Sequence, residues 1–306
     1  MIGRITNQMS AQMTLAGIET ALDRLDTTQQ ELSTGKSINQ PSDNPSGTAL
    51  ALQLNTDLSN LTSYSNNVTD GTGWATAQSS AMTDITNCVQ RIRSLTVEAS
   101  NGTQTAADMQ ASAQEVNQLI DQIKQDANTQ YNGQYVFSGS ATATQPYPSG
   151  SDTYAGNTGT VTRTIGPNTS LNISANLSGV LGSGQTVSGQ PAGDGLLLNS
   201  LRNIADDMQS GNSSAVQSDL TSLDTNLNSL NGVAANVGAV QDRLTMAASR
   251  IQTLQTSDTQ VLSNTQDADM ASTEISFSTQ QAALQAALQA GANIVQQSLM
   301  NFLGNG

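Results

Sequence analysis

Apolar residues recur at alternating steps of three and four along the first 35 residues of the chain. This heptad spacing places them in one row on an α-helix and predicts a coiled-coil helix. Gly35 follows at the position where helices commonly end in left-handed backbone. The row is narrow and partly polar, so the helix needs a partner to be stable in water. Its members are Gln8, Ala11, Leu15, Ile18, Leu22, Leu25, Gln29 and Leu32.

A second heptad row closes the chain, so both ends predict helices with an apolar face. Chain ends normally fray, and rows that reach both ends therefore favour packing of the end helices with each other and with other copies. A bundle closed within one chain is the alternative. The predicted row is Phe277, Gln281, Leu284, Leu288, Gly291, Val295, Ser298 and Phe302. The predicted assembly contacts are Leu15, Ile18, Leu22, Leu25, Leu32, Leu284, Leu288, Val295, Leu299 and Phe302.

The segment between the end helices predicts more helices and one dense cluster of turn-forming residues. Helical rows cover residues 50–99, and Thr105 with Asp108 resembles a capping box that begins a helix reaching about residue 127. Helical periodicity resumes at Leu196, and its longest row covers 220–258. The turn formers predict an ordered packing loop between helices. Its key residues are Gly35, Asn39, Pro41, Asp43 and Pro45.

Residues 140–195 differ from the rest of the chain, because they hold ten of its 25 glycines and short β-prone pieces separated by turn signals. We predict an α+β fold that is mainly α. A long antiparallel coiled-coil bundle forms from both chain ends, and a small β domain is inserted at its tip. The expected parts are a terminal coiled-coil assembly region (1–35 and 266–306), a helical rod (36–139 and 196–265) and a β-rich outer domain (140–195).

The composition excludes most catalytic chemistry. The chain has no His, and Cys88 is its single thiol, so the commonest general base, the commonest metal ligand and internal disulfides are all missing. We therefore predict no enzyme activity and no catalytic, metal or cofactor site. With 24 acidic and 10 basic residues, the net charge of −14 disfavours nucleic acid. No apolar run is long enough to span a membrane, and the first residues do not resemble a signal peptide.

Three motifs follow one another along the helical parts of the chain. The first is Leu-Ser-Thr-Gly-Lys-Ser-Ile-Asn at 32–39, followed by Pro-Ser-Asp-Asn-Pro at 41–45. The second is Arg-Ile-Arg-Ser-Leu at 91–95, which leads to Ala-Ser-Asn-Gly-Thr at 99–103. The third is Tyr-Asn-Gly-Gln-Tyr-Val-Phe-Ser-Gly at 131–139. In this order, the three motifs resemble those of the bacterial flagellins and the flagellar hook-associated proteins. The resemblance covers about residues 1–140 and 200–306 and leaves the insert unmatched.

Residues 131–139 and the ending at 290–303 resemble the hook-associated protein 3 type, which forms the hook–filament junction. This implies a structural subunit that polymerises through its terminal helices. The main filament subunit, flagellin, is the alternative. The resemblance also implies type III export without a cleaved signal peptide and an extracellular place in the flagellum. The implied partners are other copies of the chain, hook-associated protein 1, flagellin and an export chaperone at the C-terminal helix.

Overall fold

The computed structural model describes residues 7–182, 185–187, 190–192 and 194–303. The described chain forms two compact units. Unit 1 contains the residues up to Asn60 and from Leu254 onward, and unit 2 is Leu61–Thr253. Two long helices, α2 (Pro45–Ser100) and α6 (Ser213–Gln266), contribute residues to both units. The three-part division drawn from the sequence stays a prediction.

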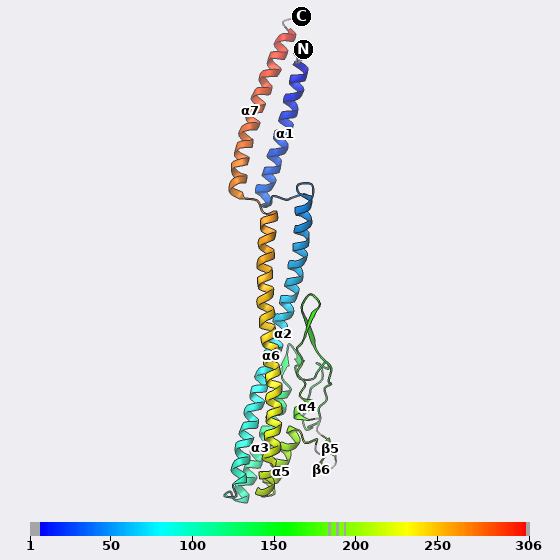
Figure 1. Cartoon of the computed structure of the whole chain (residues 1–306), viewed down its shortest axis with the longest axis vertical. Helices are drawn as coiled ribbons and strands as arrows, with labels where there is room; N and C mark the ends of the chain where they lie inside the picture. Colours follow the sequence, from blue (N-terminus) through cyan, green and yellow to red (C-terminus); the bar gives the residue numbers. More distant parts are fainter. Residues whose placement is uncertain (1–6, 183–184, 188–189, 193, 304–306) are drawn as a thin grey trace. The chain divides into compact units, whose positions relative to one another are not determined.

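Unit 1 is built around the two end helices. Helix α1 (Asn7–Thr34) and helix α7 (Met270–Leu303) lie side by side and run in opposite directions (Figure 1). The start of α2 and the end of α6 complete the unit. The antiparallel pairing of the chain ends, predicted from their heptad rows, is confirmed.

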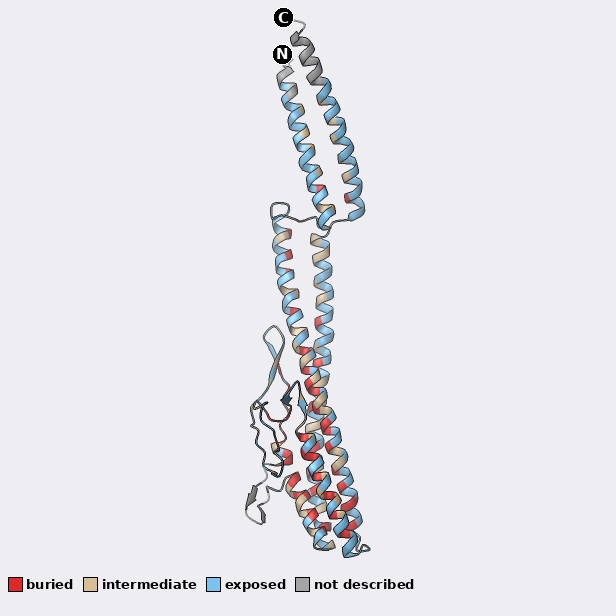
Figure 2. Ribbon diagram, turned by 180° about the vertical axis from the view of Figure 1, so that it is seen from behind, coloured by how far each residue is buried: buried red, intermediate tan, exposed pale blue. Residues whose placement is uncertain are grey.

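Unit 2 contains the main hydrophobic core, formed by α2, α3 (Ala106–Ala127), α5 (Leu197–Gln209) and α6 together with buried residues between positions 136 and 181. Figure 2 shows buried residues concentrated in these helices, whereas α1 and α7 are mostly exposed. The helical rows predicted over residues 50–99 belong to one continuous helix, α2. The capping box of α3 is present, because Thr105 and Asp108 each accept the other's backbone N–H.

Three two-stranded antiparallel pairs lie in the described part of unit 2. They are β1 (Gln130–Tyr131) with β2 (Gln134–Tyr135), β3 (Thr162–Gly166) with β4 (Thr169–Asn172), and β5 (Gln185–Val187) with β6 (Gln190–Ala192). Asn132 (φ 50°) and Gly133 (φ 77°) form the tight turn between β1 and β2. A short helix, α4 (Ser178–Leu181), is the remaining named element of this segment. The mainly helical fold with a β-containing insert is confirmed.

A cluster of charged side chains attaches the insert to the helices. Asp152 of the insert binds Lys124 of α3 (Oδ1 to Nζ, 3.0 Å) and Arg202 of α5 (Oδ2 to Nε, 2.9 Å). Arg202 also donates from Nη1 to Asn117 Oδ1 at 2.7 Å. The side chains of Asp152 and Lys124 are 16% and 8% exposed, so this ion pair is largely shielded from water. Removing one partner of this cluster is therefore expected to cost more stability than removing one partner of a surface ion pair.

Gly73 lets α2 approach the β1–β2 hairpin. A Cβ at Gly73 would overlap the Tyr131 ring, which packs edge-on against Trp74 with centroids 6.3 Å apart. We expect Gly73→Ala to lower the free energy of unfolding by about 1–3 kcal/mol through overpacking. Thermal and urea unfolding will measure the change. Gly232→Ala in α6 is the matched control, because nothing lies within 4 Å of its added Cβ.

The control should instead stabilise the chain by about 0.5–1 kcal/mol, because alanine favours the helix at this open position. Equal and small effects at both positions would contradict the close approach at Gly73.

The turn between α5 and α6 brings two carboxyl groups together. Burial, followed by the charge of nearby Asp207 and its hydrogen bond, raises the pKa of Asp219 to about 6. A raised pKa means that Asp219 contributes stability below about pH 4, its unfolded-state range, and that this contribution is lost as the pH rises through about 6. The ionised side chain therefore costs stability at pH 7.

We expect Asp219→Asn to raise the free energy of unfolding at pH 7 by about 1 kcal/mol, a value discounted for solvent screening. The gain should vanish at pH 3.5, and urea unfolding at both pH values will test this. Asp242→Asn, an exposed change on the same helix, controls for loss of one negative charge. A gain that is equal at both pH values would refute the proposed titration.

Candidate assembly surface

The loop after α1 is held by a single carboxylate. Gly35 ends the helix in left-handed backbone (φ +69°), and its N–H donates to the Glu31 carbonyl at 2.8 Å. Asp43 Oδ2 accepts the backbone N–H groups of Asn39 at 3.0 Å and Gln40 at 2.8 Å. Because these donors are satisfied within the loop, its conformation is fixed by short-range contacts.

The same loop also begins α2. The Asp43 N–H donates to the Gln40 carbonyl at 3.0 Å and closes a β-turn. Pro41 lies at the second position of this turn, where the fixed φ of proline is favoured. Asn44 then caps the helix, since its Oδ1 accepts the Gly47 N–H at 2.9 Å, and Pro45 is the first helical residue. The predicted loop residues thus form one turn-and-cap unit. Their role in assembly stays a prediction.

The segment that joins α6 to α7 is hydrogen-bonded to this loop. The Ser37 N–H donates to the Gln266 carbonyl at 2.7 Å, and the Ala268 N–H donates to the Gly35 carbonyl at 2.9 Å. The two bonds flank a short antiparallel bridge. The loop between α1 and α2 and the segment between α6 and α7 are therefore hydrogen-bonded to each other within unit 1.

Helices α1 and α7 contact along a seam whose members again alternate by three and four. Ile18, Leu25, Leu32 and Leu284 lie in it, as their heptad rows predict. Every seam member is half-buried or buried. They are Thr14, Ile18, Ala21, Leu25, Thr28 and Leu32 of α1 and Thr273, Phe277, Gln280, Leu284, Ala287 and Gly291 of α7.

Three predicted leucines lie outside this seam. Leu15, Leu22 and Leu288 are 61%, 43% and 50% exposed, because each lies one residue beyond a smaller seam residue. The two helices approach each other closely along this seam, since a Cβ at Gly291 would lie only 3.3 Å from Thr14 Cγ2. Leucines in place of these small residues would hold the helices further apart. Each heptad row therefore contains three of the six seam residues of its helix, and every other seam residue except Thr273 lies one position before a row member.

A polar contact also fixes the seam. The Thr28 hydroxyl, on a residue that is 5% exposed, donates to Gln280 Oε1 at 2.7 Å. Neither residue belonged to the predicted rows. Three further predicted contacts, Val295, Leu299 and Phe302, lie outside the residues whose side chains the structure describes.

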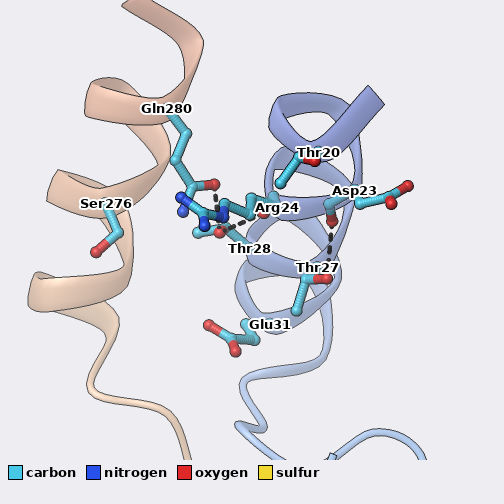
Figure 3. A pocket seen from close by; sticks show the side chains of 8 residues that line it. All are labelled: Thr20, Asp23, Arg24, Thr27, Thr28, Glu31, Ser276 and Gln280. Carbon is cyan, nitrogen blue, oxygen red and sulfur yellow. Dashed lines mark hydrogen bonds between the residues drawn. The ribbon is translucent and has the colours of Figure 1, made fainter. Parts of the chain in front are cut away.

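An open groove of about 370 Å³ follows one side of the seam (Figure 3). Arg24 projects across it toward α7, close to Thr28 and Gln280, whereas Asp23 points away. A neighbouring hollow of about 260 Å³ shares Arg24 and is otherwise lined mostly by small residues. Together the two are lined by Gly17, Thr20, Ala21, Asp23, Arg24, Thr27, Thr28, Glu31, Ser276, Gln280 and Ala283.

Among the described residues, no three carboxylate or thiol side chains gather where they could hold a metal ion. The one thiol, Cys88, lies in α2 beside the core, where burial and then nearby Asp126 and Asp84 raise its pKa. No helix in the described part of the chain is both long and apolar enough to cross a bilayer.

Both ends of the chain match family models that describe such helices. Residues 5–142 match the bacterial flagellin N-terminal helical region, and residues 220–303 match the bacterial flagellin C-terminal helical region. The chain belongs to the bacterial flagellin family. The family regions include both α1 and α7, and they leave most of the insert unmatched.

Similar flagellins share part of this sequence. Flagellin 1 of Proteus mirabilis is 38% identical over 111 residues, which are 36% of this chain and 30% of that flagellin. The phase 1 flagellin of Salmonella naestved is 33% identical over 134 residues, which are 44% of this chain and 26% of that protein. The chain therefore aligns with less than a third of the length of these flagellins.

Solved structures share the fold over a larger part of the chain. FlgL of Bacillus cereus superposes with a TM-score of 0.58 at 18% identity and covers 69% of this chain and 99% of its own. FlgL of Xanthomonas campestris gives the same TM-score and coverage at 14% identity. At such low identity the likeness establishes the fold alone.

Proposed function

We propose that this chain is a structural subunit of the bacterial flagellum that forms the hook–filament junction. Membership of the flagellin family supports the structural role. The observation that supports the junction role is that the superposition covers 99% of the length of each of two FlgL structures. The motifs at 131–139 and 290–303 point to the same type of protein.

The subunit polymerises through α1 and α7. Leu15, Leu22 and Leu288 are exposed on this pair although they are large and apolar. Their burial against another copy would remove apolar surface from water at about 25 cal/mol per Å2. The proposed partners are further copies, hook-associated protein 1 on one side and flagellin on the other. An export chaperone binds the C-terminal helix before assembly.

In this proposal the protein works outside the cell, in the flagellum, and performs no catalysis. It reaches that place by type III export, without cleavage of a signal peptide. The short-range contacts of its loops and the absence of disulfides suit a chain that folds after export.

Flagellin, the main filament subunit, is the second candidate. The identities of 33–38% to two flagellins favour it. Against it, these alignments cover less than a third of either flagellin, so much of the length of those filament proteins has no counterpart in the alignment.

Counting the copies of an epitope-tagged chain in isolated flagella will distinguish the two roles. A junction protein should give about one ring of label between hook and filament, and its deletion should leave hooks without filaments. Label along the whole filament would establish flagellin instead. Absence of the chain from flagella would overturn both candidates.

A further inference from the structure

The two flanks of the α1/α7 pair are chemically different. On one flank, Leu15, Leu22 and Leu288 each follow a seam residue by one position. We name these three residues the leucine flank. On the other flank, each residue precedes a seam residue by one position. Those that line the two hollows are Gly17, Thr20, Arg24, Thr27, Glu31, Ser276 and Ala283, which we name the arginine groove.

Antiparallel geometry supports this division into flanks. In an antiparallel helix pair, the positions before the seam on both helices share one side, and the positions after it share the other. The hollows beside Arg24 are lined by Gly17 of α1 together with Ser276 and Ala283 of α7, as this geometry requires. The three leucines consequently share the opposite side.

Arg24 has no acidic partner in the described part of the chain, although its guanidinium projects across the groove toward α7 (Figure 3). It is also the single basic residue in the sequence of 7–34 and 270–303. The acidic residues of these helices are Glu19, Asp23, Asp26, Glu31 and Glu274. A carboxylate from a molecule outside the α1/α7 pair would form an ion pair with the Arg24 guanidinium.

The leucine flank carries suitable carboxylates beside it. Glu19 follows Leu15 by four residues and Asp26 follows Leu22 by four, so the four side chains form one stripe along α1. All four are exposed. The stripe thus presents large apolar side chains and two carboxylates, whereas the groove presents small residues, the guanidinium of Arg24 and the carboxylate of Glu31.

We propose that neighbouring copies of the chain dock through these unlike flanks. The stripe of one copy lies in the arginine groove of the next, where its leucines pack beside Gly17 and Ala283 and its carboxylates pair with Arg24. Because the two surfaces differ, the contact is heterologous and propagates into a ring or tube rather than closing as a dimer. The inference rests on the proposed structural role and specifies its subunit contact.

Charge reversal on each flank tests the pairing. The full-length chain is expressed in a strain without its own copy, and its amount in isolated flagella is measured by immunoblot. Arg24→Glu alone and Glu19→Arg with Asp26→Arg should each reduce incorporation at least about tenfold. All three changes together should restore most of it. Arg243→Glu, an exposed reversal in unit 2, should incorporate normally.

Disulfide cross-linking tests the orientation of the contact independently. With Cys88→Ala as background, copies carrying Leu22→Cys and copies carrying Ala283→Cys are expressed together and oxidised in isolated flagella. The mixture should yield a cross-linked pair, and Leu22→Cys alone should not. Cross-linking of Leu22→Cys copies to each other would show a symmetric contact and overturn the proposal.

The outcomes separate the two ideas. A wild-type chain that is missing from flagella overturns the proposed function. A wild-type chain that is present while Arg24→Glu incorporates equally well overturns only the flank pairing. A third outcome is that Arg24→Glu fails to incorporate, the combined variant does not restore incorporation, and no mixed cross-link forms. This result would assign the groove to a different flagellar protein and would also overturn the pairing.

Discussion

Replacing Leu288 with Asp is expected to reduce incorporation into flagella by at least about tenfold while leaving the free subunit folded. Leu288 is 50% exposed on the leucine flank, so the change should alter the free energy of unfolding by no more than about 0.5 kcal/mol. In an assembled contact, however, it would bury a charge without a partner. Immunoblots of isolated flagella and urea unfolding of the purified chain measure the two effects.

Ile275→Asp supplies the matched control on the same helix. Ile275 is 69% exposed and lies on the outer face of α7, away from both flanks. The same chemical change there should leave incorporation near the wild-type level. Normal incorporation of Leu288→Asp would remove the leucine flank from the assembly contact. Equal losses in both variants would show that the outer face takes part as well.

Replacing Asp152 with Ala is expected to lower the free energy of unfolding by about 3–5 kcal/mol. The change leaves Lys124, whose side chain is 8% exposed, and Arg202 without their shared carboxylate. Unpaired charges that are shielded from water are costly. The insert should also become more sensitive to proteases, because Asp152 connects it to α3 and α5. Urea unfolding and limited proteolysis measure these effects.

The pH dependence of this cluster has a defined sign. Burial acts to raise the pKa of Asp152, but hydrogen bonds and charges from Arg202 and Lys124 outweigh it and hold the pKa below the ordinary value. Asp152 therefore contributes stability above its ordinary pKa, and this is lost as the pH falls through the lowered value. Asp152→Ala should remove that part of the acid sensitivity.

Arg163→Ala is the control for the ion cluster. Arg163 of β3 binds Asp70 of α2 at 2.7 Å, so it also joins the hairpin region to a helix. Their side chains are 26% and 37% exposed, and the pair should contribute about 1 kcal/mol or less. An Asp152→Ala variant that loses no more stability than Arg163→Ala would contradict the large cost expected for removing Asp152 from the cluster.

Local signals predicted the ends of several helices. Gly35 adopts the left-handed backbone expected after α1, and Thr105 with Asp108 forms the capping box of α3. Each of these features depends on residues within a few positions of one another. The sequence therefore carries the information for them without knowledge of the fold.

Several contacts could not be predicted because their partners are far apart in the sequence. Asp152 and Arg202 meet only when the insert packs on α5, and Thr28 meets Gln280 across 252 positions. Arg24 did carry a signal, as the lone basic residue of the end helices. Its importance depends on the groove, which exists only after α1 and α7 have paired.

The heptad rows of the chain ends predicted from the sequence alone that the end helices pair, and the composition showed that His, the commonest general base, is missing. The tertiary structure decided which row forms the seam. Two adjacent rows were available on each helix, and close approach at Gly291 with the Thr28–Gln280 hydrogen bond selects the row of smaller residues. Helical spacing sets which residues align along a helix, but packing between two helices decides which of them become buried. That choice leaves Leu15, Leu22 and Leu288 on the outside, where we propose that the next subunit binds.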